Sequence, residues 1–372
     1  MSSVRHIAAE AGVSISTVSR ALNNDPAVNP RTREIVLAVA NRTGYVATVG
    51  RRVTNNIAFA YAGRQTISSV YDSALLEGIV RGADTSRFDV MLLNLQRDKG
   101  AEETYTQFFM RKGVRAVVLR TTSESRHVCQ AIADENFPMV VISERFESKN
   151  VSFVDCDSKT DSIRAVEYLI SLGHRRIALV MHVIPDCDHL DRFEGYREAM
   201  IGHGLPVDER LVLRFPANLS GGATAMAMLS RMANRPTAAF FADPMLAVGA
   251  VNKAHELGIQ IPEDLSVVGF DDSDIRHSVY PTLTAVCQDA AQLGHEAALR
   301  LTRMLVRKKM ERFQITLPSF FEANGSTGAP PVCRLQGPAS DLGLAPGPVE
   351  VDTRRLDPPS PLTLRHLEQE HQ

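Results

Sequence analysis

Ser16 and Arg20 are polar residues four positions apart in the segment HIAAEAGVSISTVSRAL. Side chains of these two types can form hydrogen bonds with the bases of DNA. At about 100° per residue they lie on one side of a helix, while Val18 and Leu22 lie on nearly the opposite side. Arginine donates two hydrogen bonds to guanine, a hydroxyl contacts several bases, and an apolar residue such as Ile15 touches a thymine methyl. The pattern therefore predicts a helix that contacts base edges in the major groove.

Three short helices in residues 1–47 are expected to position this polar face. Gly12 supplies the tight turn before the second helix, and Ser14 caps the N-terminus of that helix. Asn29 followed by Pro30 is a typical start for a third helix. Three helices around one small core, with a polar outer face on the second, predict a helix-turn-helix. A plain three-helix cap with a solvated Ser/Arg face is the alternative.

The phosphate backbone is a second expected target of this segment. Ser14, Thr17 and Asn23 would hold phosphates, which sets the register on DNA without selecting sequence. Residues 1–56 contain seven Arg and no Lys against three acidic residues, so this end carries +4 and the remainder of the chain −6. A basic module on an acidic body is expected where one end meets a polyanion.

From residue 57 onward apolar strands alternate with helical segments. Strands are expected at residues 57–62, 89–94, 115–120, 138–143, 176–181, 237–243 and 265–271. Strands separated by helices indicate βαβ units, so the fold class is α/β with two doubly wound parallel sheets behind the helix-turn-helix headpiece. The second series of strands begins near residue 153, which predicts two half-domains with a ligand cleft at the carboxyl ends of the strands.

The run GVSISTVSRALN, followed by NPRTREIVLAVANRTGY, resembles the DNA-binding headpiece of the lactose-repressor (LacI/GalR) family of bacterial transcription regulators. The resemblance implies that Ile15, Ser16 and Arg20 contact bases. It also implies a linker that forms a short hinge helix and wedges the minor groove open.

Later segments resemble the effector-binding core that these repressors share with periplasmic sugar-binding proteins. The matching runs are LISLGHRRIALV, DRFEGYREAM, LGIQIPEDLSVVGFDD and YPTLTAVCQD. The resemblance extends from about residue 4 to about residue 328 and implies crossings between two subdomains near Asp155, Pro281 and Phe313. The expected parts are a headpiece (1–47), a hinge linker (48–56), a core (57–328, with an N-subdomain of about 57–153 and 285–312 and a C-subdomain of about 154–283 and 313–328) and a disordered tail (329–372).

Effector contacts are expected where polar residues follow strands, in agreement with the family pattern. They are Tyr71, Asp72, Arg145, Arg192, Asp243 and Asp271. Arginines donate in a fork and carboxylates accept from hydroxyls, so this set suits a polyhydroxylated or anionic ligand. Each Asp at a strand end also has an ordinary interpretation as a helix cap or a salt-bridge partner.

Two departures from the family pattern affect these expectations. Asp243-Pro244 stands where the family usually has Asn-Asp, which removes one amide donor and one carboxylate from the usual ligand set. The linker is also shorter than the family's. Arg51 and Arg52 would contact phosphates there, but Gly50 argues against a stable hinge helix, so we expect weaker DNA bending than is usual.

Enzyme and metal chemistry have little support in the sequence. P-loop, Gly-x-Gly-x-x-Gly, Gly-x-Ser-x-Gly and His-Glu-x-x-His patterns are missing, so we expect no catalysis and no cofactor. The cluster DCDHLD (186–191) could bind a divalent metal, but its spacing favours a polar cleft loop leading into a helix at Arg192. Five scattered cysteines support neither a disulfide framework nor a zinc ribbon.

These observations predict a sequence-specific DNA-binding transcription regulator, a repressor that binds a near-palindromic operator as a homodimer. A small-molecule effector, such as a sugar or sugar derivative, would bind in the cleft. We expect a cytoplasmic protein without a membrane partner, because no leader or apolar run of about 18 residues is present. The alternative is a solute-binding protein or cleft enzyme of periplasmic-binding-protein-like fold with no DNA role.

Overall fold

A computed structural model describes residues 3–23, 25–43, 45, 54–63, 69–184 and 186–331. The chain divides into a first unit, Met1–Pro331, and a second unit, Val332–Gln372. The predictions for the linker, including Arg51 and Arg52, and for the tail beyond residue 331 lie outside the described residues. None of the helices that the structure describes is long and apolar enough to span a bilayer.

The predicted helix-turn-helix is present at the N-terminal end. Its helices are α1 (Val4–Ala11), α2 (Ile15–Leu22) and α3 (Pro30–Arg42). Gly12 adopts a left-handed conformation at φ 67° and ends α1, which reverses the chain before α2. Ile7, Val18 and Val36 are fully buried and form the small core that holds the three helices together.

Six described strands form the first sheet, in the order β11-β5-β4-β3-β1-β2. They are β1 (Asn56–Tyr61), β2 (Asp89–Asn94), β3 (Val114–Arg120), β4 (Met139–Ile142), β5 (Phe153–Asp157) and β11 (Gln314–Pro318). The helices between them are α4 (Val70–Asp84), α5 (Leu95–Asp98), α6 (Tyr105–Arg111), α7 (Arg126–Asp134), α12 (Ala290–Arg307) and the 3-10 helix η1 (Ser123–Ser125). Each described pair of neighbouring strands is parallel, as the βαβ pattern predicts.

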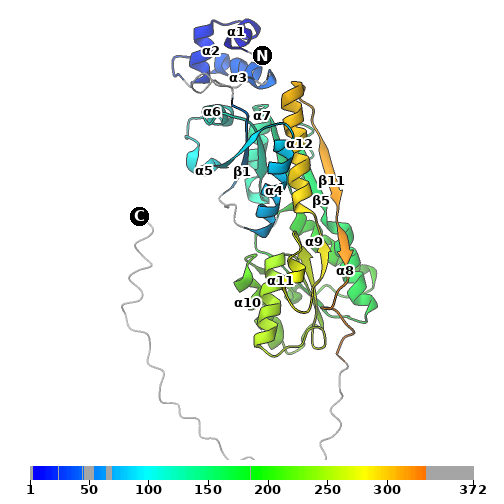
Figure 1. Cartoon of the computed structure of the whole chain (residues 1–372). Coiled ribbons are helices and arrows are strands. Elements are labelled where there is room, and N and C mark those ends of the chain that lie inside the picture. Colours follow the sequence, from blue (N-terminus) through cyan, green and yellow to red (C-terminus); the bar gives the residue numbers. More distant parts are fainter. Residues whose placement is uncertain are drawn as a thin grey trace, which may run out of the picture. The chain divides into compact units, whose positions relative to one another are not determined.

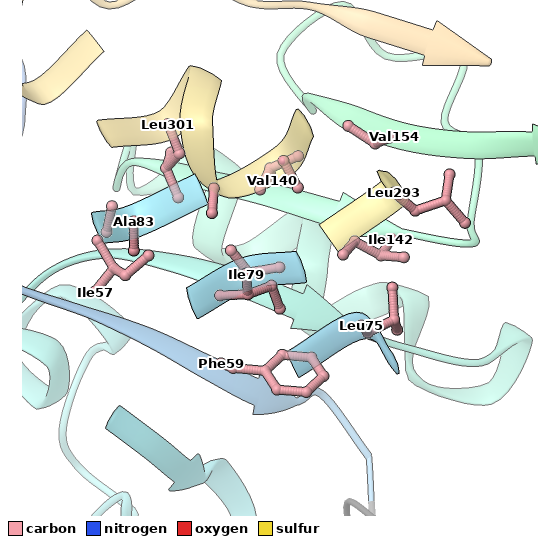
Figure 2. Close-up of a cluster of buried hydrophobic side chains, with 14 of the residues drawn as sticks. Ile57, Phe59, Leu75, Ile79, Ala83, Val140, Ile142, Val154, Leu293 and Leu301 are labelled. Atoms are coloured by element: carbon pink, nitrogen blue, oxygen red, sulfur yellow. The ribbon is translucent and has the colours of Figure 1, made fainter. Parts of the chain in front are cut away.

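Helices α4 and α12 lie side by side over one face of this sheet (Figure 1). Figure 2 shows the buried cluster between these helices and the sheet, to which α4 contributes Ile79, α12 contributes Leu301 and the sheet contributes Ile57 and Val140. The helices approach closely because Gly78 has no side chain: a Cβ there would lie 1.8 Å from the carbonyl oxygen of Ala291.

The second sheet also has six described strands, in the order β12-β10-β9-β8-β6-β7. They are β6 (Ile177–His182), β7 (Val212–Phe215), β8 (Ala238–Phe241), β9 (Ser266–Asp271), β10 (Thr284–Cys287) and β12 (Phe320–Glu322). Its helices are α8 (Ser158–Ser171), α9 (Cys187–Gly202), α10 (Leu219–Arg231), α11 (Pro244–Glu256) and the 3-10 helices η2 (Glu209–Leu211) and η3 (Ile275–Ser278). Only the edge strand β12 pairs antiparallel among these described strands.

The chain passes between the sheets after β5, between β10 and α12, and between β11 and β12. The expected crossings near Asp155, Pro281 and Phe313 therefore precede the observed changes of sheet by a few residues. The reason is strand pairing: β5 stays in register with β11 as far as Asp157 opposite Pro318, and β10 still pairs with β9. Local sequence contains no record of such non-local partners.

Candidate DNA-recognition helix and effector cleft

The outer face of α2 is built as the sequence predicts. Ser14 is the N-cap, and its hydroxyl accepts from the backbone N–H of Thr17 at 3.1 Å and lies 2.8 Å from the hydroxyl of Ser16. Val18 and Ala21 are buried on the inner face, which turns Ser16 and Arg20 outward. The arrangement leaves a row of hydroxyl groups and one guanidinium open to a partner.

Arg20 and Ile15 are accessible for base contacts. The Arg20 side chain is 62% exposed and its Nε lies 3.9 Å from Asp25, at the limit of an ion pair. Such an exposed pair contributes little, so the guanidinium is available to another acceptor. Ile15 is 50% exposed, so its side chain is open to a partner. Asn23 ends the helix and donates from Nδ2 to the carbonyl of Ser19.

A cavity of about 230 Å³ lies at the carboxyl ends of strands from both sheets. Its lining includes Tyr61, Tyr71, Asp72, Arg120, Thr122, His182, Asp186, Asp188, His189, Arg192, Asp243, Pro244, Met245, Asp272 and Gln288. Parallel sheets bind ligands at this edge because strands end there and helices begin. The cavity is therefore the candidate effector site.

Four of the six predicted effector residues line this cavity: Tyr71, Asp72, Arg192 and Asp243. Asp72 belongs to a capping box at the start of α4 and accepts from the hydroxyl of Tyr61. Contact of these residues with an effector stays a prediction.

Arg145 and Asp271 occupy other positions. Arg145 donates to Asp191 on α9 at 2.6 Å and faces Asp155 at 3.4 Å. Asp271 accepts from Arg276 at 2.6 Å and from the backbone N–H of Ile275 at 3.0 Å. Neither is among the lining residues, and their predicted effector contacts remain predictions.

Arg192 is buried and held in a defined orientation. Its Nη1 donates to the carbonyl of Ala242 at 2.6 Å, and its guanidinium lies 3.5 Å from the centre of the Phe270 ring. Its Nε has no hydrogen-bond partner among the described residues. A ligand acceptor at that nitrogen would satisfy a buried donor.

His189, which the sequence analysis did not select, joins two carboxylates in the cavity. Its Nδ1 donates to Asp186 at 2.6 Å and its Nε2 to Asp243 at 3.1 Å. Burial lowers the pKa of His189, but the two carboxylates outweigh burial and raise it to about 10. The ring is therefore an imidazolium at neutral pH.

The segment DCDHLD is the beginning of α9. Asp186 is its N-cap and accepts from the backbone N–H of His189 at 3.1 Å. Asp186 also accepts from Arg120 at 3.0 Å, so its negative charge is balanced by a cation of the protein itself. The predicted polar loop is wrong, because residues 187–191 already belong to α9, which begins at Cys187 and not at Arg192. The physical reason is the side chain of Asp186, which caps the helix five residues earlier than expected.

The fold and the two candidate sites define a class of protein: a regulator with a DNA-binding headpiece on a ligand-binding core. Residues 3–56 match the family model of bacterial regulatory proteins of the lacI family, and residues 166–322 match the periplasmic binding protein-like domain. The HTH-type transcriptional regulator DegA of Bacillus subtilis (strain 168) is 32% identical over 331 residues, which cover 86% of this chain and 96% of DegA. The HTH-type transcriptional repressor CytR of Escherichia coli (strain K12) is 30% identical over 80% of this chain and 88% of CytR.

Solved structures agree. The complex of the transcriptional regulator CelR with cellobiose aligns with 88% of this chain and 100% of CelR, at a TM-score of 0.63 and 26% identity. A LacI family transcriptional regulator from Enterococcus faecium with bound ribose aligns with 74% of this chain and 99% of its own, at a TM-score of 0.64 and 27% identity. The chain belongs to the LacI family of bacterial transcription regulators, and it is a DNA-binding transcriptional regulator.

Proposed function

We propose that this regulator is a repressor that binds a near-palindromic operator as a homodimer and that a small molecule in the cleft changes its operator affinity. The observation that carries the proposal is the exposed face of α2, with Ile15, Ser16 and Arg20 outward and Val18 buried, in a chain that also holds a polar cavity between two sheets. A two-fold protein favours a two-fold site, because each headpiece contacts one half-site.

The proposed DNA contacts divide by chemistry. Ile15, Ser16 and Arg20 contact base edges in the major groove. The phosphate contacts are Ser14, Thr17, Asn23, Arg51 and Arg52. Because Ser14 and Thr17 lie at the start of α2, their hydroxyls and backbone N–H groups suit a phosphate at the helix N-terminus.

The proposed effector binds in the cavity that Tyr71, Asp72, Arg192 and Asp243 line. The related structures with cellobiose and ribose support a sugar or sugar derivative. An effector changes operator affinity only by its preference for one arrangement of the core over another. The protein would act in the cytoplasm without catalysing a reaction, as the bacterial regulators among its relatives support.

Selection of bound fragments from sheared genomic DNA tests the proposal. The full chain is incubated with fragments at a stated, near-physiological salt concentration, because phosphate contacts depend strongly on salt. We expect enrichment of one near-palindromic sequence by the wild type and its loss in the variant Arg20→Ala. Uniform recovery of all fragments by both proteins would contradict sequence-specific regulation, and enrichment of a single half-site would contradict the homodimer.

A further inference from the structure

The cavity between the two sheets is lined by more carboxyl groups than cationic groups. The cationic groups are the guanidiniums of Arg120 and Arg192 and the imidazolium of His189, and five carboxyl groups lie in the same lining. The carboxylates are Asp72, Asp186, Asp188, Asp243 and Asp272. A buried surplus of one sign is costly unless a partner of opposite charge enters.

The protein neutralises one side of the cavity with its own cations. Arg120 donates to Asp186 at 3.0 Å, and His189 donates to both Asp186 and Asp243. This side is therefore closed by ionic hydrogen bonds.

Asp272 on the other side has a neutral partner. It is 7% exposed, and it accepts from the amide Nε2 of Gln288 at 2.6 Å. That bond fixes the orientation of the amide and directs the carbonyl oxygen of Gln288 away from Asp272. Gln288 is 4% exposed, and its Oε1 has no hydrogen-bond partner among the described residues. This corner of the cavity offers acceptors and needs donors.

The first residue of α11 adds no backbone donor to the cavity wall. Pro244 begins α11 at the cavity wall and has no N–H. Among the described residues that line the cavity, the buried donors without a hydrogen-bond partner are Nε of Arg192 and Nε of Arg120. A ligand that satisfies the cavity should therefore donate at Asp272 and Gln288 and accept at the guanidinium nitrogens.

We propose that the effector is a polyhydroxylated amine, whose protonated nitrogen lies against Asp272 and Oε1 of Gln288 and whose hydroxyl oxygen accepts from Nε of Arg192. An ammonium group carries three donors and no acceptor, which matches the corner. Charge-assisted bonds to a desolvated carboxylate are the strong kind. This inference rests on the proposed effector role of the cavity and narrows it to a cationic ligand class.

The protonation of Asp272 agrees with this assignment. Burial raises the pKa of Asp272 to about 7, against the opposing charge of Arg192. This carboxyl is therefore partly protonated at neutral pH when no cation lies beside it. A bound cation restores the carboxylate, so proton release should accompany binding.

Two matched sets of probes test the ligand class by isothermal titration calorimetry on the full chain. The ring set is D-glucosamine, D-glucose and D-glucuronate, and the open-chain set is glucamine, sorbitol and gluconate. Each set offers a cation, a neutral polyol and an anion of similar size. We expect the cationic member of at least one set to bind about tenfold more tightly than its neutral counterpart. Repetition in buffers of different ionisation enthalpy should reveal proton release.

Asp272→Asn is the diagnostic variant, because asparagine keeps an oxygen for the Gln288 amide and removes the charge. We expect the preference for the cation to fall to about threefold or less. Asp84→Asn removes an equal charge at the exposed end of α4 and should leave the preference unchanged. Thermal unfolding and operator binding of both variants check that the chain is folded.

The outcomes separate this inference from the proposed function. Tighter binding of a neutral or anionic probe, failure of both cationic probes to bind, or an undiminished preference in Asp272→Asn would overturn the cationic ligand class. Loss of operator enrichment in the wild type would instead overturn the regulator proposal. A neutral sugar that binds more tightly than its cationic counterpart and shifts operator affinity would leave the regulator proposal intact and refute the amine.

Discussion

Arg20 carries the most specific prediction at the scale of single residues. Its guanidinium is exposed and loosely paired with Asp25, so replacement costs the fold little. Arg20→Ala should weaken operator binding by about 1–3 kcal/mol and relax specificity at one base pair. Arg20→Lys keeps the positive charge but cannot donate two parallel hydrogen bonds as the guanidinium does. Compared with Arg20→Ala, it should regain affinity for random DNA without regaining specificity.

Fluorescence anisotropy on operator and random duplexes at one salt concentration measures both effects. Equal losses on the two duplexes would show that Arg20 contacts phosphate only.

His189 predicts a pH dependence of stability. Its pKa is raised from about 6.5 in the unfolded chain to about 10, as burial is outweighed by Asp186 and Asp243. The folded protein therefore binds one more proton than the unfolded chain between these values. The stabilisation is complete below the unfolded pKa, declines above it and is lost as the pH rises through about 10, with a slope of about 1.4 kcal/mol per pH unit.

Urea unfolding from pH 6 to pH 10 measures this effect in the wild type and in His189→Gln. We expect the free-energy difference between the two proteins to shrink as the pH rises. A constant difference would mean that His189 stabilises the fold as a neutral ring.

The sequence could predict part of the candidate site, and the misses have physical reasons. Tyr71, Asp72 and Asp243 lie where helices begin, and Arg192 lies in the first half of α9, so local patterns pointed to these residues. Asp271 was predicted because it ends a strand, whereas the next residue, Asp272, lines the cavity. The effector contact of Asp271 stays a prediction.

The remaining misses are non-local. Gln288 directly follows β10, a strand of four residues that pairs with β9 and β12. Four residues are too few to show a strand periodicity in the sequence, so nothing local pointed to Gln288.

At the scale of elements, the helices of the headpiece and most strands of the core were predictable. Caps such as Ser14 and alternating apolar runs such as residues 57–62 are local signals, and the structure confirms them. Strands β5, β7, β10, β11 and β12 were not predicted. Among them β5 pairs with β11 and β10 pairs with β12, and the members of each pair lie far apart along the chain. The same non-local pairing sets where the chain changes sheet.

The packing of α4 on α12 predicts a large effect of one methyl group. A Cβ at Gly78 would lie 1.8 Å from the carbonyl oxygen of Ala291. That oxygen belongs to the backbone of α12, so it cannot move aside as the end of a flexible side chain could. Gly78→Ala must therefore separate the helices, and we expect a loss of about 1–3 kcal/mol in the free energy of unfolding.

Gly202→Ala is the matched control, since nothing lies within 4 Å of a Cβ at the end of α9. Helix propensity should make it neutral or stabilising by up to about 1 kcal/mol. Thermal unfolding of the two variants compares them, and equal midpoints would contradict the close helix contact.

At the scale of the whole molecule, the start of α9 connects the two sheets of the core. The helix packs on the second sheet, yet Asp186 pairs with Arg120 at the end of β3 and Asp191 pairs with Arg145 beyond β4. The backbone N–H of Cys187 also donates to Glu144 at 3.2 Å. Three contacts from one helix start thus hold the cleft in the arrangement described.

This arrangement predicts that Arg145 acts through closure of the core. Arg145→Met removes the bond to Asp191 and leaves a half-buried carboxylate without its cation, so the ligand-free core should open and its radius of gyration in small-angle X-ray scattering should increase. Asp191→Asn should do the same, and the double variant should open no further, because both changes remove the contact between Arg145 and Asp191 that joins the two halves. The second pair of Arg145, with Asp155 of β5, lies within the first half of the core. Arg164→Met breaks a pair with Asp161 inside α8, within one half of the core, and should leave the radius unchanged. An unchanged radius in Arg145→Met would assign the closed arrangement to the three strand crossings alone, and effector binding would then have to work against those crossings instead of against an ionic contact.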